Sequence, residues 1–352
     1  MFRTRIVTGL GFALLISFAG CRVDPELKPA LPVGEVKEII PQGWPQPAYR
    51  FEGNAPDAKK FELGRALFYE TRLSKDNTIS CGSCHQQYVA FAHADHDLSH
   101  GFNDAVGVRN SPALFNLTWH SSFMHDGGVN HIEVQPIAPI TNPVEMGEEL
   151  SAVISKLNAD PGYKQLFADA YGSEEVSSDK MLKAMAQFMG MLYSYNSKYD
   201  KYKRGEPGGD LRESELRGYS LFVAKCGSCH KEPLFSDFEF RNNGLKVDPV
   251  LNDSGRAVIT LDPKDLYKFK TPSLRNVAVT APYMHDGRYR TLEECLEHYT
   301  SGIRNYTNLD PLLQEYGIPL ESGQRRDIIA FLHTLTDFDF IKDKRFADPN
   351  FR

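Results

Sequence analysis

The sequence contains the same pentapeptide, CGSCH, at residues 81–85 and again at residues 226–230. A C-x-x-C-H motif arises rarely by chance, and two copies with identical filler residues exclude coincidence. Two thiols three residues apart lie on one face of a helical turn, where both can form thioethers with one haem. The histidine that follows is then held beneath the iron as its proximal ligand. The chain is therefore predicted to carry two covalent c-type haems.

Each motif predicts a complete attachment site. A zinc ribbon or a redox dithiol would also use paired cysteines, but neither needs a histidine directly after the pair. The predicted thioether and proximal residues are Cys81, Cys84 and His85 in the first site, and Cys226, Cys229 and His230 in the second.

The first 21 residues, MFRTRIVTGLGFALLISFAGC, have the pattern of an export signal. Two arginines precede an apolar run of about a dozen residues, which is too short for an ordinary transmembrane helix. The ending FAGC resembles a bacterial lipoprotein cleavage site, so residues 1–20 are predicted to be removed and Cys21 to be lipidated. The alternative is a plain secretory signal. Bacterial c-type haem attachment also occurs outside the cytoplasmic membrane, so a lipid-anchored protein on its periplasmic face is expected.

Length, charge and cysteine count limit the remaining possibilities. The 352 residues suggest two domains, and a net charge of −6 without a basic block gives no indication of nucleic-acid binding. Of six cysteines, four are assigned to haem and one to the lipid, which leaves Cys295 alone. A structural disulfide therefore has no partner, and Cys295 is predicted to be a small buried residue on a helix.

The body of the chain repeats itself loosely after a proline-rich tether over residues 21–47. Each half has CGSCH, then RNSP or TPSLRN, then MHDG. From haem histidine to MHDG histidine the distance is 40 residues (85 to 125) in one half and 55 (230 to 285) in the other, because of a loop-like insertion at 242–256. The predicted domains are residues 48–205 and 206–352.

Helical patterns dominate both predicted domains. One helix is predicted over 180–203 and a closing amphipathic helix over 324–338, while RGEPGGD at 204–210 predicts a boundary between them. Strand signals are few. The predicted fold class is all-α, with two cytochrome c-like domains and long loops. The helix predicted over 180–203 has apolar residues at helical spacing. We interpret them as core residues rather than haem ligands: Met181, Met185, Phe188, Met189 and Leu192.

Taken together, RNSP, V-E-M and TPSLRN-x₄-APYMHDG resemble the bacterial di-haem cytochrome c peroxidases and their relative MauG, over roughly residues 50–340. The resemblance implies reduction of hydrogen peroxide at the N-terminal haem, with electrons entering through the C-terminal haem from a small cytochrome c or copper protein. MauG-like oxidation of a protein substrate and a non-catalytic electron carrier are the alternatives. Family members often form homodimers.

The resemblance also assigns the peroxide-reacting side chains. The family's glutamate in the V-E-M context corresponds to Glu145, and its glutamine, ten residues earlier, to Gln135. A carboxylate near the iron can move a proton between the two peroxide oxygens. Outside the family frame, a glutamate in NPVEMGEEL would be an ordinary solvated loop residue.

A calcium ion between the domains is implied as well. Its family ligands, one asparagine side chain and two backbone carbonyls, correspond to Asn110, Thr280 and Pro282. Oxygen donors suit calcium, with water completing the shell. Asn110 could instead cap a turn.

The chain departs from the peroxidases near the N-terminal haem. In the peroxidases a distal histidine blocks this iron, but an ungapped alignment of SHGF (99–102) places Phe102 there. The favoured expectation is an open, MauG-like site. His100, two residues earlier, is the alternative iron ligand, and His93 and His96 are more remote candidates.

Two further departures concern electron transfer. The family's relay tryptophan is replaced by His125, which is harder to oxidise. The distal ligand of the C-terminal haem, methionine in peroxidases and tyrosine in MauG, corresponds to Tyr299, with His298 adjacent and Met284 earlier in the motif. Methionine raises a haem potential, whereas an anionic tyrosinate would stabilise Fe(III) and lower it.

Overall fold

The computed structural model describes residues 35–314 and 317–350. The predicted signal peptide, Cys21 and the first part of the tether lie outside them. The described chain is mostly helical, with one two-stranded sheet, which confirms the all-α prediction. Within these ranges there is no helix long and apolar enough to cross a membrane.

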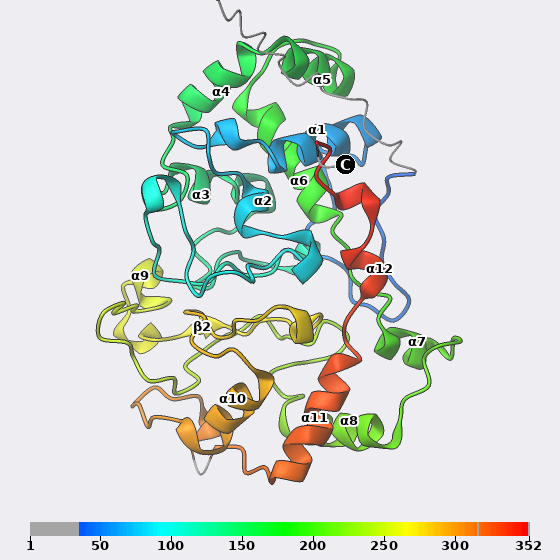
Figure 1. The fold of residues 1–352 in the computed structure, drawn as a ribbon, viewed down its shortest axis with the longest axis vertical. Helices are drawn as coiled ribbons and strands as arrows, with labels where there is room; N and C mark the ends of the chain where they lie inside the picture. Colours follow the sequence, from blue (N-terminus) through cyan, green and yellow to red (C-terminus); the bar gives the residue numbers. More distant parts are fainter. Residues whose placement is uncertain (1–34, 315–316, 351–352) are drawn as a thin grey trace, which may run out of the picture.

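The upper half in Figure 1 contains six of the labelled helices. Side chains of Asp57, Asp160 and Ser177 accept backbone N–H groups at the starts of α1, α5 and α6, so local sequence fixes where these helices begin. The helices are α1 (Ala58–Phe68), α2 (Cys81–Cys84), α3 (Ile137–Thr141), α4 (Leu150–Asn158), α5 (Pro161–Tyr171) and α6 (Ser178–Gly190).

The lower half and the connections between the halves contain the other labelled elements (Figure 1). The helices are α7 (Lys198–Arg204), α8 (Glu213–Lys225), α9 (Ala257–Thr260), α10 (Leu292–Glu297), α11 (Ser322–His333) and α12 (Phe338–Ile341). The strands β1 (Phe240–Arg241) and β2 (Phe269–Lys270) pair antiparallel, with Phe240 opposite Lys270.

The internal repeat is visible in a pair of crossing helices in each half. α1 packs on α6 above, and α8 packs on α11 below. Each crossing uses a glycine at the contact: a Cβ on Gly64 would lie 1.9 Å from the carbonyl oxygen of Ala184, and a Cβ on Gly218 would lie 1.9 Å from that of Asp327. Only glycine allows the two backbones to approach so closely.

The MHDG segments repeat the same backbone turn. Met124 and Met284 have positive φ angles of 67° and 71°. The residue before each methionine bonds across the turn, since Phe123 N donates to Val129 O and Tyr283 N donates to Tyr289 O, both at 2.7 Å. The two halves therefore share local geometry as well as sequence.

The two hydrophobic cores exchange segments between the halves. Phe340, Ile341 and Phe346, near the C-terminus, pack in the upper core, whereas Tyr199 packs in the lower core. Figure 1 shows the red C-terminal segment running upward from α11 to lie beside the upper half. The predicted domain boundary at 205/206 stays a prediction. Because a segment from each side of this boundary packs in the core of the other half, the two halves are connected through their cores.

The insertion of the second half also reaches the first half. Arg109 donates to both carboxylate oxygens of Asp253, at 2.6 and 2.8 Å, and also to Asp126. Arg256 donates to the carbonyl oxygen of Asp126 at 2.9 Å. The predicted loop insertion is thus a connecting element between the halves.

The single helix predicted over 180–203 is wrong, because α6 and α7 are separate. In the extended link between them, Asn116 bonds to Ser194 twice: its side-chain amide donates to Ser194 O, and its side-chain oxygen accepts from Ser194 N, both at 2.9 Å. These tertiary hydrogen bonds replace helical ones. The predicted core positions are confirmed, because Met181, Met185 and Met189 are at most 2% exposed.

The closing helix and the unpaired cysteine were predicted nearly as observed. α11 ends at His333, earlier than predicted, and the short α12 follows after a turn. Cys295 lies on α10 as a half-buried free thiol.

Candidate functional site

The first CGSCH motif forms a short capped helix beside a large cavity. Ser80 and Ser83 form a capping box at the start of α2, which carries Cys81 and Cys84. His85 follows, and its Nδ1 lies 2.9 Å from the carbonyl oxygen of Phe91. This hydrogen bond orients the ring and leaves Nε2 free to ligate a metal.

The second motif has the same arrangement. His230 Nδ1 lies 3.1 Å from the carbonyl oxygen of Phe235. Burial lowers the pKa of both motif histidines, that of His85 to about 4. Each imidazole is therefore neutral near pH 7, as an iron ligand must be.

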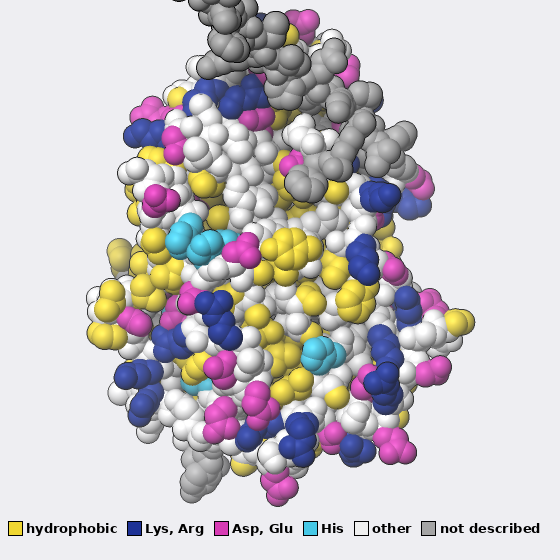
Figure 2. Space-filling model, viewed as in Figure 1, with side chains coloured by type: hydrophobic (Ala, Val, Ile, Leu, Met, Phe, Trp, Pro, Cys, Tyr) yellow, Lys and Arg dark blue, Asp and Glu magenta, His cyan; other side chains and the backbone are white. Residues whose placement is uncertain are grey.

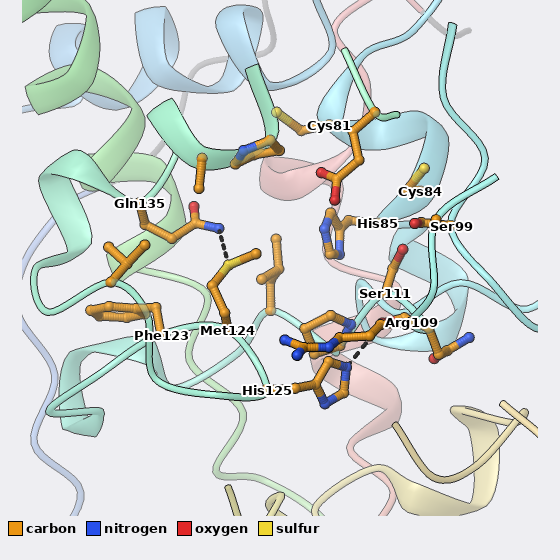
Figure 3. A pocket seen from close by; sticks show the side chains of 18 of the residues that line it. Cys81, Cys84, His85, Ser99, Arg109, Ser111, Phe123, Met124, His125 and Gln135 are labelled. Atoms are coloured by element: carbon orange, nitrogen blue, oxygen red, sulfur yellow. Dashed lines mark hydrogen bonds between the residues drawn. The ribbon is translucent and has the colours of Figure 1, made fainter. Parts of the chain in front are cut away.

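The cavity beside the first motif is large enough for a haem. Its volume is about 630 Å³, within the usual range for small-molecule and cofactor sites. Cys81, Cys84 and His85 line it together with residues of the RNSP, MHDG and TPSL segments, and several of these side chains are shown in Figure 3. Paired thiols, an oriented imidazole and an apolar wall all fit a covalent haem.

Removal of the first thiol pair tests this assignment. A chain carrying both Cys81→Ala and Cys84→Ala is expected to retain one covalent haem rather than two, because thioethers cannot form without thiols. Intact mass and haem staining after denaturing electrophoresis measure the number. Cys295→Ala is the matched control and should keep both haems; two haems in the double variant would contradict the assignment.

The structure brings both predicted peroxide-reacting residues to the cavity. Glu145 and Gln135 line it. Burial raises the pKa of the Glu145 carboxyl, although a 3.1 Å hydrogen bond from the Asn142 amide acts in the opposite direction. Gln135 is buried, and its amide nitrogen lies 3.8 Å from Met124 Sδ (Figure 3). A carboxyl with a raised pKa in a cavity is a typical proton-transfer group.

Phe102 contacts the backbone of Glu145 and is not among the residues that line the cavity. Its backbone N–H donates to the Glu145 carbonyl at 2.8 Å, and its ring packs against Gly147. His100 lines the cavity, and its ring lies 4.1 Å from the His96 ring. His93 extends this row, with its Nε2 3.3 Å from His96 Nδ1. Which of these groups faces the iron stays a prediction.

His125 lies where the two halves meet. Its Nε2 bonds to the Asn110 carbonyl at 2.9 Å (dashed in Figure 3), and its own carbonyl accepts the backbone N–H of Lys270 on β2 at 2.7 Å. Lys270 also lines the cavity, and its Nζ donates to Ser122 O at 2.6 Å. Sequence reasoning missed Lys270, which directly precedes the TPSLRN motif.

Apolar side chains from both halves line one part of the cavity. Ile259 of α9 lines it from the second half, and Val106 and Val108 line it from the first. Leu261, just beyond α9, is 86% exposed. Figure 2 shows hydrophobic side chains gathered at the left edge of the molecule, where α9 lies in Figure 1.

Tyr299 lies close to the second haem motif. It belongs to a π-helical turn, His298–Gly302, a feature frequent at functional sites. Burial raises the pKa of its phenol to about 12, and the Cys226 and Cys229 thiols act in the same direction through their proximity. Tyr299 therefore lies in the same part of the lower half as the thiols that would hold the C-terminal haem.

The side chains of the predicted calcium ligands Asn110 and Thr280 donate to backbone carbonyls in this structure. The Asn110 amide nitrogen donates to the carbonyl oxygens of Asp97 and His96, at 2.9 and 3.3 Å. Thr280 Oγ1 donates to Val277 O, and Pro282 follows a cis peptide bond. Asn110 thus holds a loop in this structure, and the calcium ion stays a prediction.

Comparisons with known proteins agree with this geometry. The model of a family described as di-haem cytochrome c peroxidase matches residues 58–208. MauG, the methylamine utilization protein of Methylorubrum extorquens, is 34% identical over 84% of this chain and 82% of its own. Cytochrome c551 peroxidase of Nitrosomonas europaea is 32% identical over 95% and 92%. The crystal structure of a MauG-like protein associated with microbial copper homeostasis has 34% identity and a TM-score of 0.80, over 88% and 98%.

Proposed function

Because the chain belongs to the di-haem cytochrome c peroxidase family of oxidoreductases, which includes MauG-like proteins, we propose that it reduces hydrogen peroxide at the N-terminal haem. One peroxide takes up two electrons and two protons and gives two waters. The supporting observation is the shared cavity, where Cys81, Cys84 and His85 lie with Glu145 and Gln135. When bound, the haem supplies the iron and the electron exchange for O–O cleavage.

Glu145 has the proton-transfer role in this proposal. As a carboxylate it accepts the proton of one peroxide oxygen, and as the acid it returns that proton to the other oxygen, which leaves as water. Burial raises its pKa, so the acid form gives up its proton less readily than an exposed glutamate. Gln135 supplies a carboxamide that can donate to or accept from peroxide.

The electrons enter at the C-terminal haem from a small cytochrome c or copper protein, and His125 is the proposed bridge between the halves. Its backbone contact to Lys270 supports this role, because it connects the MHDG loop of one half to β2 of the other. Calcium held by Asn110, Thr280 and Pro282, a lipid anchor on the periplasmic side and a homodimer complete the proposal.

MauG-like oxidation of a protein substrate is the second candidate. The observation that favours it is Tyr299, a half-buried tyrosine in the neighbourhood of the thiols of the second motif, where peroxidases have methionine. A phenolate ligand would stabilise Fe(III) and make that haem a poorer acceptor of donor electrons.

Mixing with peroxide in two redox states tests these readings. Stoichiometric peroxide is added to holo-protein that is fully ferric or half-reduced, and the haem absorption is followed. We expect a rapid change in the fully ferric protein, because the ungapped alignment predicts Phe102 at the position of the blocking histidine. A change only after half-reduction would identify His100 or a neighbour as a blocking ligand. No change in either state would favour the alternative of a non-catalytic electron carrier.

A further inference from the structure

One loop residue, Asn243, contacts every side chain considered above as a distal ligand of the C-terminal haem. Its side-chain amide nitrogen lies 3.5 Å from the Tyr299 hydroxyl and 3.8 Å from Met284 Sδ. Its backbone carbonyl lies 3.1 Å from His298 Nε2. No motif marks this asparagine, which lies in the segment read from sequence as a loop insertion.

The orientation of the Asn243 amide is fixed by its own loop. Its side-chain oxygen accepts the backbone N–H of Leu245 at 3.2 Å, so the NH₂ group must point the other way, toward Tyr299 and Met284. The loop is held in turn by Asn242, which is 1% exposed and accepts from Gly244 N at 2.9 Å. The amide donors are therefore preorganised.

The first half contains a matching contact. There the amide nitrogen of Gln135 lies 3.8 Å from Met124 Sδ, the methionine of the other MHDG segment. In both halves a carboxamide thus engages the methionine sulfur. Among the described residues, only the carboxamide of the second half also reaches a phenol.

These contacts treat the three candidate ligands differently. His298 Nε2 is occupied by the Asn243 carbonyl, so His298 cannot use that nitrogen for iron without breaking a buried contact. Met284 accepts from the same amide through its sulfur, but a neutral thioether is a weak acceptor, so the amide donors favour a charged phenolate oxygen over it. The Tyr299 oxygen can keep its hydrogen bond while ligating, because a phenolate has further lone pairs, and a charged acceptor shortens such a bond.

We propose that Asn243 is a positioning residue that selects Tyr299, rather than Met284 or His298, as the distal ligand of the C-terminal haem. This inference rests on the proposed role of Tyr299. It assigns to one side chain the choice between an anionic oxygen and a thioether sulfur, and hence the potential at which that haem accepts electrons.

Two variants of the full holo-protein remove the amide donors. Asn243→Leu is similar in size, and Asn243→Asp keeps the acceptor for Leu245 N if the leucine variant folds poorly. The readouts are the ferric absorption and electron paramagnetic resonance spectra and a redox titration, with haem content as the folding check. We expect the C-terminal haem to lose its phenolate signature, acquire that of a thioether, and titrate at a higher potential.

Two controls separate this inference from the proposed function. Met284→Leu alone should leave the spectra unchanged, and added to Asn243→Leu it should prevent the thioether signature. If Tyr299→Phe changes the spectra while both Asn243 variants match the wild type, Tyr299 ligates without help and the inference is overturned. If Tyr299→Phe changes nothing, the proposed ligand fails, and the inference fails with it.

Discussion

Replacement of Glu145 by glutamine is expected to lower the rate of peroxide reduction by about two to four orders of magnitude, the usual contribution of a general acid–base group. Glutamine preserves the shape of the side chain and can still pair with the Asn142 amide, which donates to Glu145 at 3.1 Å. It cannot carry a proton from one peroxide oxygen to the other. Steady-state turnover with a reduced donor protein measures the loss, and haem content should remain at two per chain.

The matched control for this variant is Glu149→Gln. Glu149 is exposed and lies four residues further along the same acidic segment, so its replacement changes the net charge equally without touching the cavity. Its turnover should match the wild type. An unchanged rate in Glu145→Gln would remove the carboxylate from the mechanism.

Local sequence was sufficient for the parts of the site that depend on short-range chemistry. The C-x-x-C-H motifs and the core methionines need only a few neighbouring residues, and the structure has each in the predicted surroundings. Glu145 and Gln135 were located through family resemblance, since the segment NPVEMGEEL carries no local sign that it borders a cavity. Their catalytic roles remain predictions until the variants are measured.

The features that sequence did not predict depend on contacts between distant segments. The break between α6 and α7 follows from hydrogen bonds of Ser194 to Asn116, 78 residues away. Asn243 reaches Tyr299 across 56 residues, from a segment whose composition indicates only a loop. Helical periodicity and turn composition contain no information about such partners.

The second large effect is expected in stability, at an ion pair between segments from the two predicted domains. Arg275 is 1% exposed and donates to both oxygens of Asp200, at 2.8 Å each. Its guanidinium also lies 4.5 Å from the Trp44 ring. Burial acts to raise the pKa of Asp200, but hydrogen bonds and charge from Arg275 hold it below its usual value. This contribution to stability is present above about pH 4 and lost as the pH falls further.

Asp200→Asn is expected to lower the free energy of unfolding by about 3–5 kcal/mol, because it leaves the buried Arg275 charge uncompensated. Urea unfolding of the holo-protein measures the change. Glu206→Gln is the control: its pair with Arg204 also uses two short hydrogen bonds but is exposed, so the loss should be far smaller than in Asp200→Asn. Adding Arg275→Met to Asp200→Asn should recover part of the stability, since the unpaired charge is gone. Equal losses in the two single variants would show that burial does not strengthen this pair.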